Sequence, residues 1–232
     1  MKKPTLQFRG PSLMLLAVAH ILVFAAGLVS AVALRHGASF VTPFASAEQM
    51  RLFFTQNPAA VRVSNFFLFG SAVPLGIFAV TAVSRLRFYG VRAAGTNIAL
   101  FGGICAAIAL FLSGIFGWEL SVPEVSASAA AAKASYFLSF LSGGVFYSVA
   151  FGLLAAGVSI TGYFTRLLPR WLAVLGICVA LAGELSSFSL ITFPANFLIP
   201  ITRYIGFIWM LLAAAALRRD RRVAGAAKPN AA

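Results

Sequence analysis

Two ionisable side chains lie deep inside long apolar runs of the sequence, and they are the first candidates for chemistry. Glu184 lies ten residues before Pro194, and His20 lies within the first apolar run. An ionisable group inside lipid costs roughly 2.5–3.5 kcal/mol on insertion scales, so it is by default a functional candidate. We expect Glu184 to be largely protonated at neutral pH unless water or a cation reaches it, because burial disfavours the charged form.

Counting residues from the ends of the apolar runs gives the depth of each polar side chain. Tyr147 and Trp209 match the depth of Glu184, and His20 lies nearer the predicted cytoplasmic side. A candidate site for a proton, a cation or a small amphiphile therefore consists of Glu184, Tyr147, Trp209 and His20. The alternative is that the Glu184 carboxyl is neutral and joins two helices by a hydrogen bond, and that His20 is an ordinary interhelical histidine.

Arg203 is an obvious partner for Glu184, because the hairpin between them is short, but geometry argues against the pair. The two side chains lean in opposite directions across a depth gap of about 9 Å. Arg203 lies about 5 Å below the outer edge of its apolar run. Long basic side chains in this position reach outward to water. We therefore predict that Arg203 extends to the outer surface.

The sequence has no residue pattern typical of metal or covalent chemistry. Cys105 and Cys178 lie in apolar runs without Cys-x-x-Cys spacing, as small buried hydrophobes would. Paired haem ligands and a His-Glu-x-x-His motif are excluded, because His20 is the only histidine in an apolar run. We expect no metal, no cofactor and no enzymatic activity.

The composition identifies the class of protein. Of the 232 residues, 61% are hydrophobic and 10% are charged, and the mean hydropathy is +0.95. Soluble domains are near 45–50% apolar and about 25% charged, so this chain has too little polar surface for water. A soluble enzyme, a disordered chain and a nucleic-acid-binding domain are excluded despite the formal charge of +13. The composition predicts a polytopic membrane protein.

Six apolar segments are long enough to cross a bilayer. A crossing takes about 20 mostly apolar residues, and each segment should be helical because lipid offers no hydrogen-bond partner to the backbone. We predict an all-α fold, with one bundle of six transmembrane helices over residues 1–217 and a basic, disordered tail over residues 218–232. The six segments are 12–34, 64–84, 96–118, 136–160, 171–193 and 200–217.

The first segment has a second interpretation. Lys2, Lys3 and Arg9 precede it, and small residues end it, as in a secretory signal. Its 23 residues exceed a typical signal core and suffice to span a bilayer, which favours an uncleaved first span.

Basic residues are distributed unevenly between the two sides. With the N-terminus inside, thirteen Lys and Arg lie on the cytoplasmic side and five lie on or near the other. Because basic residues favour the cytoplasmic side, we predict that both termini are cytoplasmic. The five basic residues on or near the outer side are Arg35, Arg51, Arg62, Lys133 and Arg203.

The long loop after the first segment contains the signals of a short helix. Ser46 followed by Glu48 and Gln49 is typical of a helix start, and Asn57-Pro58 of a stop. This helix would either lie flat on the outer membrane interface or cap the bundle.

A short motif precedes the fifth segment. It is Leu168-Pro169-Arg170-Trp171-Leu172, and Ile208-Trp209 follows in the sixth segment, while Asn57-Pro58 and Arg62 precede the second. In these features the chain resembles a broad family of bacterial six-span membrane proteins that is catalogued as a domain of unknown function. The resemblance implies a bacterial cytoplasmic (inner) membrane and supplies no activity.

Two functions remain open from the sequence. The first is a small binding or transport module that uses the polar layer around Glu184. The second is a non-catalytic accessory or scaffold protein that packs against other membrane proteins. The expected partners are the lipid bilayer and either other membrane proteins or further copies of this chain, and no nucleic acid.

Overall fold

The computed structural model describes residues 5–36, 39–217 and 220–222, and it confirms the predicted all-α fold. Six helical segments in this part of the chain are long and apolar enough to cross a membrane, so the chain is a multi-pass membrane protein. The spans are Leu13–Ala33, Pro58–Phe88, Ala94–Glu119, Ala129–Phe164, Arg170–Leu190 and Phe193–Ala216.

Several spans consist of more than one secondary-structure element. The fourth joins two α-helices through a π-helical turn, η1, and the last two contain 3₁₀ turns, η2 and η3. The elements are β1 (Thr5–Gln7), α1 (Leu13–Ala33), α2 (Ala47–Gln56), α3 (Pro58–Phe88), α4 (Ala94–Glu119), α5 (Pro123–Ser126), α6 (Ala129–Leu141), η1 (Ser142–Phe146), α7 (Tyr147–Phe164), α8 (Arg170–Leu185), η2 (Ser186–Leu190), η3 (Phe193–Phe197), α9 (Leu198–Ala216) and β2 (Asp220–Arg222).

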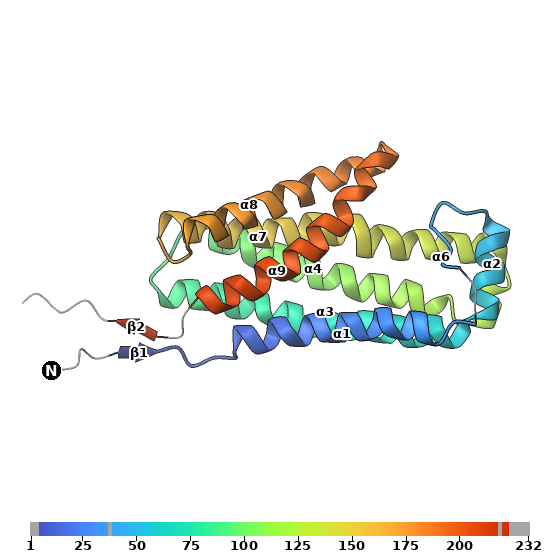
Figure 1. The fold of residues 1–232 in the computed structure, drawn as a ribbon, viewed down its shortest axis with the longest axis horizontal. Helices are drawn as coiled ribbons and strands as arrows, with labels where there is room; N and C mark the ends of the chain where they lie inside the picture. The colour runs from blue at the N-terminus through green and yellow to red at the C-terminus, as the bar shows by residue number, and fades with distance from the viewer. Residues whose placement is uncertain (1–4, 37–38, 218–219, 223–232) are drawn as a thin grey trace, which may run out of the picture.

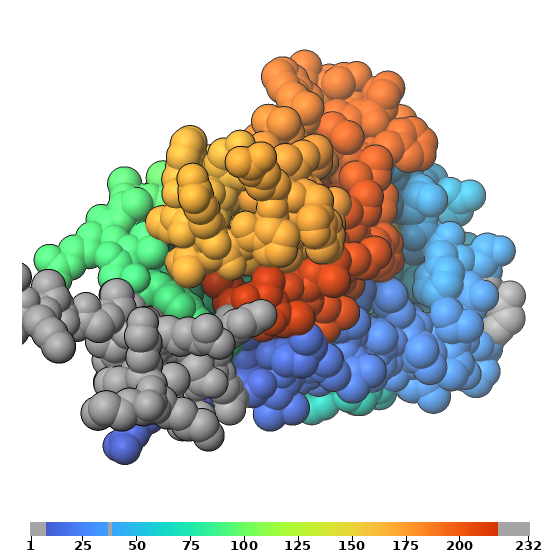
Figure 2. All heavy atoms as spheres, turned by 60° about the vertical axis from the view of Figure 1, so that its left-hand side comes forward, coloured from blue at the N-terminus to red at the C-terminus, as the bar shows by residue number. Residues whose placement is uncertain are grey.

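The long helices pack side by side, and the last one closes the bundle (Figure 1). α3 contacts α1 and α4, α7 contacts α4 and α8, and α9 contacts both α8 and α1. The α8–α9 hairpin leans away from the other helices toward its tip, and Figure 2 shows this tip standing out from the rest of the molecule. α9 therefore crosses the bundle obliquely and brings its side chains against α1 and α7.

Several helix boundaries differ from those expected. α3 begins at Pro58, because proline fits the first helical position, where its missing N–H would have no partner. α6 begins at Ala129 rather than near residue 136, because alanine has the highest helix propensity and the Ser128 hydroxyl caps the helix. α8 ends as an α-helix at Leu185 and continues as a 3₁₀ turn to Leu190.

The short helix predicted after the first span is present as α2, which lies across one end of the bundle (Figure 1). Ser46 and Gln49 form its capping box, and Asn57 ends it. Met50 and Phe54 are buried toward the bundle. The hydrogen bond from Arg51 lowers the pKa of Glu48 on the outward face. Of the two expected positions, α2 takes the one that caps the bundle. We call this end the α2 end.

The opposite end, which we call the terminal end, holds β1 and β2, the first and last elements of the described chain (Figure 1). β1 pairs with β2 in an antiparallel ladder, with Thr5 opposite Arg222. Arg85 is buried at the end of α3 and donates to the carbonyls of Leu217 and Pro11, at 2.6 Å and 3.3 Å. The predicted disordered tail, 218–232, lies outside the described residues except for Asp220–Arg222.

Candidate functional site

Arg203 on α9 turns inward, which corrects the prediction that it extends to the outer surface. Its Nη2 donates a hydrogen bond to the backbone carbonyl of Gly143. Its guanidinium carbon lies 4.7 Å from the centre of the Tyr147 ring and 5.2 Å from that of Phe24. A guanidinium is attracted to the face of an aromatic ring. Arg203 is thus held by α7, α1 and the π-helical turn η1.

The carbonyl that receives Arg203 belongs to the irregular middle of the fourth span. η1 has the sequence Ser-Gly-Gly-Val-Phe over Ser142–Phe146, and a π-helical turn shifts hydrogen bonds from i→i+4 to i→i+5. Gly143 also lies against α4, where a Cβ atom would be 2.9 Å from the Ser113 Cβ. The glycines therefore allow close approach of the backbone here, and π-helical turns are frequent at functional sites.

Tyr147 and Trp209, two of the predicted site residues, are fully buried on either side of Phe151. The Tyr147 and Phe151 rings stack with centroids 5.6 Å apart, and the Phe151 and Trp209 rings meet edge to face at 6.1 Å. Trp209 Nε1 donates to the Ser159 hydroxyl at 3.1 Å. The Trp209 N–H therefore has a hydrogen-bond partner within the protein, and the ring packs against Phe151.

His20, the third predicted residue, belongs to α1 and packs against Phe207 of α9. It is fully buried, and its Nδ1 is 2.8 Å from the Ser71 carbonyl. Because a carbonyl can only accept, Nδ1 carries the proton. The Phe207 ring contacts the rings of both His20 and Phe24, each at 5.3 Å. A series of ring contacts, from His20 to Phe207 and from Phe207 to Phe24, therefore leads to the Arg203 guanidinium.

Three buried polar atoms in this group of side chains have no hydrogen-bond partner among the described residues. They are His20 Nε2, the Tyr147 hydroxyl and Arg203 Nε, from α1, α7 and α9. A buried polar group without a partner costs about 1–3 kcal/mol, and more when it is charged. Of these three residues, Arg203 also lines a cavity, which makes it the candidate for receiving a polar group from outside the chain.

Glu184, the fourth predicted residue, does not join this group. Its neighbour Gly183 faces α7, where a Cβ atom would lie 2.5 Å from the Ser148 carbonyl. One residue is about 100° of helix rotation, so Glu184 points elsewhere. It is exposed beside Leu181 and Leu185, which are 57% and 49% exposed. The prediction compared only the depths of the residues along the membrane, whereas the Glu184 side chain points away from the helices that carry the other three.

A cavity of about 170 Å³ opens beside Arg203, in the half of the bundle nearer α2. It lies between α3, α4, α6, η1 and α9. Two serines form part of its wall and exchange hydrogen bonds across α4 and α6: Ser113 Oγ donates to the Ser139 carbonyl, and Ser139 Oγ donates to the Ser113 carbonyl. The lining residues are Leu68, Ser113, Tyr136, Ser139, Phe140, Gly143, Gly144, Ile199 and Arg203.

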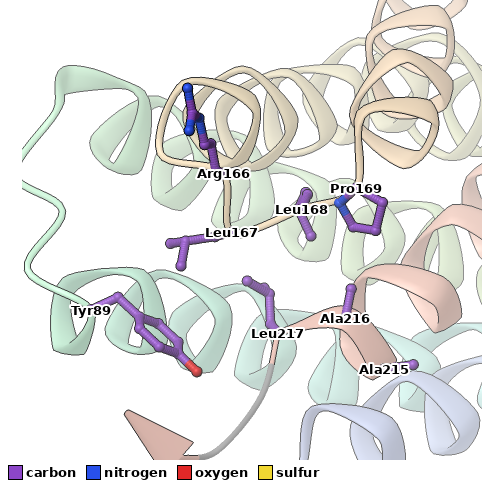
Figure 3. Close-up of a pocket in the computed structure, with 8 residues that line it drawn as sticks. All are labelled: Tyr89, Arg166, Leu167, Leu168, Pro169, Ala215, Ala216 and Leu217. Atoms are coloured by element: carbon purple, nitrogen blue, oxygen red, sulfur yellow. The ribbon is translucent and has the colours of Figure 1, made fainter. Parts of the chain in front are cut away.

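A wider hollow of about 560 Å³ lies at the terminal end, between α3, the α7–α8 connection and α9 (Figure 3). Leu167, Leu168 and Leu217 project toward it, whereas the Arg166 guanidinium points away. The lining side chains are therefore mostly leucine and alanine, with Tyr89 and Arg166 as the polar ones. Metal binding has no obvious site either, since no group of three or more His, Cys, Asp or Glu comes together within the described residues.

Comparison with known proteins adds no relative: no family model, curated protein or solved structure matches this chain. The site must therefore be interpreted from its own chemistry. The residue that sequence reasoning missed is Arg203. A signal was present, because Arg203 falls within the buried stripe of α9 that includes Ile199, Gly206 and Met210, spaced as one helix face.

Proposed function

We propose that this membrane protein is a binding module for a small anionic ligand, with Arg203 as the residue that holds the anion. The Tyr147 ring lies against the guanidinium, and Trp209 packs against Phe151 on the other side from Tyr147, while His20 reaches Arg203 through ring contacts with Phe207 and Phe24. One observation carries the proposal: a guanidinium lies inside a membrane span beside a cavity, and its Nε has no partner among the described residues.

The argument rests on the cost of a buried charge. A guanidinium stays protonated in proteins, so it cannot avoid the cost by losing its proton. Burying an ion costs several kcal/mol unless an opposite charge or several hydrogen bonds compensate. Arg203 has one backbone acceptor and two aromatic faces. The salt bridge found in the described part of the chain joins Arg51 and Glu48, at the surface. An anion from outside the chain would supply the missing charge.

The same charge argues against two of the ligand classes that the sequence left open, a proton and a cation. A fixed positive charge repels a metal cation or a hydronium ion and attracts a carboxylate or phosphate. Arginine also presents several N–H donors in a fork that fits both of these groups. The ligand is therefore an anion or an amphiphile with an anionic group.

Arg203→Gln should abolish anion binding. In the full-length protein reconstituted in phosphatidylcholine nanodiscs, we expect butyrate or inorganic phosphate to bind with a Kd on the order of 1 mM and to raise the unfolding temperature. Glutamine keeps a polar side chain but removes the charge, so the rise should disappear. Differential scanning fluorimetry against ligand concentration measures it.

Two matched variants serve as controls for this titration. Arg62→Gln removes a positive charge at the same end of the bundle, outside the cavity lining, and should leave the rise unchanged. Glu184→Gln should also leave it unchanged. An equal rise in the wild-type protein and in Arg203→Gln would contradict the proposal.

The accessory or scaffold role is a second candidate, and the position of Glu184 favours it. This carboxyl is exposed on a spanning helix, next to the exposed Leu185 and Phe188. A polar group that faces lipid is expensive. A helix of another membrane protein would cover it. Binding of an anion at Arg203 and packing of α8 against a partner are compatible in one molecule.

For the orientation, we propose that both termini are cytoplasmic and that the membrane is the bacterial cytoplasmic membrane. The excess of basic residues on one side and the family resemblance support this. Alkaline phosphatase fused after residues 40 and 125 should be active, and fusions after 90, 165 and 225 should be inactive, because the enzyme folds only outside the cytoplasm. The opposite pattern would invert the topology, and no alternation would overturn the six spans.

A further inference from the structure

We propose that the anionic ligand is an amphiphile, whose charged group binds Arg203 and whose apolar chain lies in a second cavity beneath α2. This inference rests on the proposed function and specifies its ligand class. The second cavity has a volume of about 130 Å³. It is lined by Ala31, Phe40, Phe53, Phe54, Ala60, Val61, Ser64, Asn65, Gly117, Leu120, Tyr136 and Ser139.

The two cavities adjoin each other along α6. Both are lined by Tyr136 and Ser139, which belong to α6. Of the two, only the cavity beside Arg203 has a charged side chain in its lining. Most residues that line the cavity beneath α2 are aromatic or aliphatic, and Ser64, Asn65 and Ser139 also contribute to its wall. A site with a charge at one end and apolar walls at the other is complementary to a molecule with the same division.

α2 closes the apolar cavity on the side away from Arg203. Its Phe53 and Phe54 belong to the cavity wall, and the Phe54 ring meets the Tyr136 ring at 5.1 Å. The Tyr136 hydroxyl donates to the Val41 carbonyl at 2.8 Å, which ties the loop before α2 to α6. Tyr136 thus touches both cavities and the cap. A chain that runs from Arg203 past Tyr136 would end beneath α2.

The size of the second cavity sets the length of chain that it accepts. An apolar cavity of about 150 Å³ takes a benzene ring, so 130 Å³ holds on the order of five carbon atoms. Each methylene group buried there should improve the affinity about fourfold. The affinity should therefore rise with chain length and then stop rising once the cavity is full. A free inorganic anion would gain nothing from this arrangement.

Straight-chain carboxylates from butyrate to dodecanoate test this inference, with the full-length protein in phosphatidylcholine nanodiscs. Ala31→Leu adds three carbons to a side chain that lines the second cavity, so it should abolish most of the gain with chain length and leave butyrate affinity unchanged. Val32→Leu is the matched control, because this neighbour on α1 is 54% exposed and faces away from the bundle.

The control also accounts for partition into lipid, which raises the apparent affinity of long chains equally in both variants. A second variant changes the cavity in the opposite direction. Phe53→Ala enlarges it and should move the plateau to longer chains. If Ala31→Leu destabilises the protein, Phe53→Ala still decides the question.

The outcomes separate this inference from the proposed function. An equal gain with chain length in Ala31→Leu and Val32→Leu, together with an unmoved plateau in Phe53→Ala, overturns the amphiphile and leaves the anion site in place. Binding of phosphate through Arg203 without binding of carboxylates also overturns it, in favour of a free anion. If Arg203→Gln changes the binding of no probe at any chain length, the anion site itself is wrong.

Discussion

Gly102→Ala should destabilise the bundle by about 3 kcal/mol. Gly102 lies where α4 meets α7, and an added Cβ atom would be 2.5 Å from the backbone nitrogen of Leu154 and 2.6 Å from the Ala150 carbonyl oxygen. Overpacking a core costs about 1–3 kcal/mol, and here the obstacle is the backbone, which cannot rotate away. α7 also requires a glycine at this contact, since a Cβ atom on Gly157 would be 2.6 Å from the Ala99 nitrogen.

Gly70→Ala is the matched control for this substitution. The Cβ atom would meet nothing nearer than Val23 Cγ1, at 3.6 Å. Alanine also favours a helix over glycine by about 1 kcal/mol, so this variant should be as stable as the wild-type protein or more stable. Unfolding in mixed detergent micelles, followed by circular dichroism, measures both. Equal stability of Gly102→Ala and Gly70→Ala would show that α4 and α7 can separate without cost.

The spans and the cap helix could be predicted because their signals are local. An apolar run of about 20 residues has one stable form in lipid, so all six spans were found. The Ser46–Gln49 capping box marks the start of α2 directly in the sequence. The start of α6 at Ala129 was not predicted, because the prediction followed the apolar run that begins near residue 136 and left out the helix propensity of the alanines before it.

The site was predicted in part, because sequence gives depth in the membrane but not direction around a helix. Depth correctly grouped Tyr147 with Trp209, which lie on either side of Phe151. It also grouped them with Glu184, which faces outward. Arg203 was assigned to the surface from its depth alone. The direction in which it points depends on the oblique path of α9, a property of the whole bundle.

The π-helical turn at Ser142–Phe146 is the other feature that could not be predicted. Two adjacent glycines permit it, but small residues in spans usually mark close helix contacts without a change of helix type. Here they do both, since Gly143 lies against Ser113 and also presents its carbonyl to Arg203.

Two arginines, the buried Arg85 at the terminal end and the half-buried Arg203 beside the cavity, should respond oppositely to the same substitution. Arg85→Met should lower the free energy of unfolding by about 3 kcal/mol, because Arg85 donates to the last carbonyl of the bundle, Leu217, and to Pro11 ahead of α1. Hydrogen bonds from a charged donor contribute about 1.5–3 kcal/mol each, and a cation also stabilises the C-terminal end of a helix. Met keeps the length of the side chain and loses these bonds.

Arg203→Met should leave the free energy of unfolding unchanged or raise it. The variant loses one hydrogen bond, to Gly143, but it also removes a charge that has no opposite charge among the described residues. Replacing buried ions by apolar side chains is often neutral or stabilising by 1–4 kcal/mol. A residue kept at a cost to stability is one that serves binding.

The exposed Arg87→Met is the control for both, and it should change stability by about 0.5 kcal/mol or less. Unfolding of the three variants in the same micelles compares them directly. If Arg203→Met is as destabilising as Arg85→Met, the Arg203 guanidinium has a structural role like that of Arg85. The unpartnered Arg203 Nε would then have no role in binding, and both the proposed anion site and the proposed amphiphile ligand would be wrong. If only Arg85→Met is destabilising, the arginine beside the cavity remains the residue that stability alone does not explain.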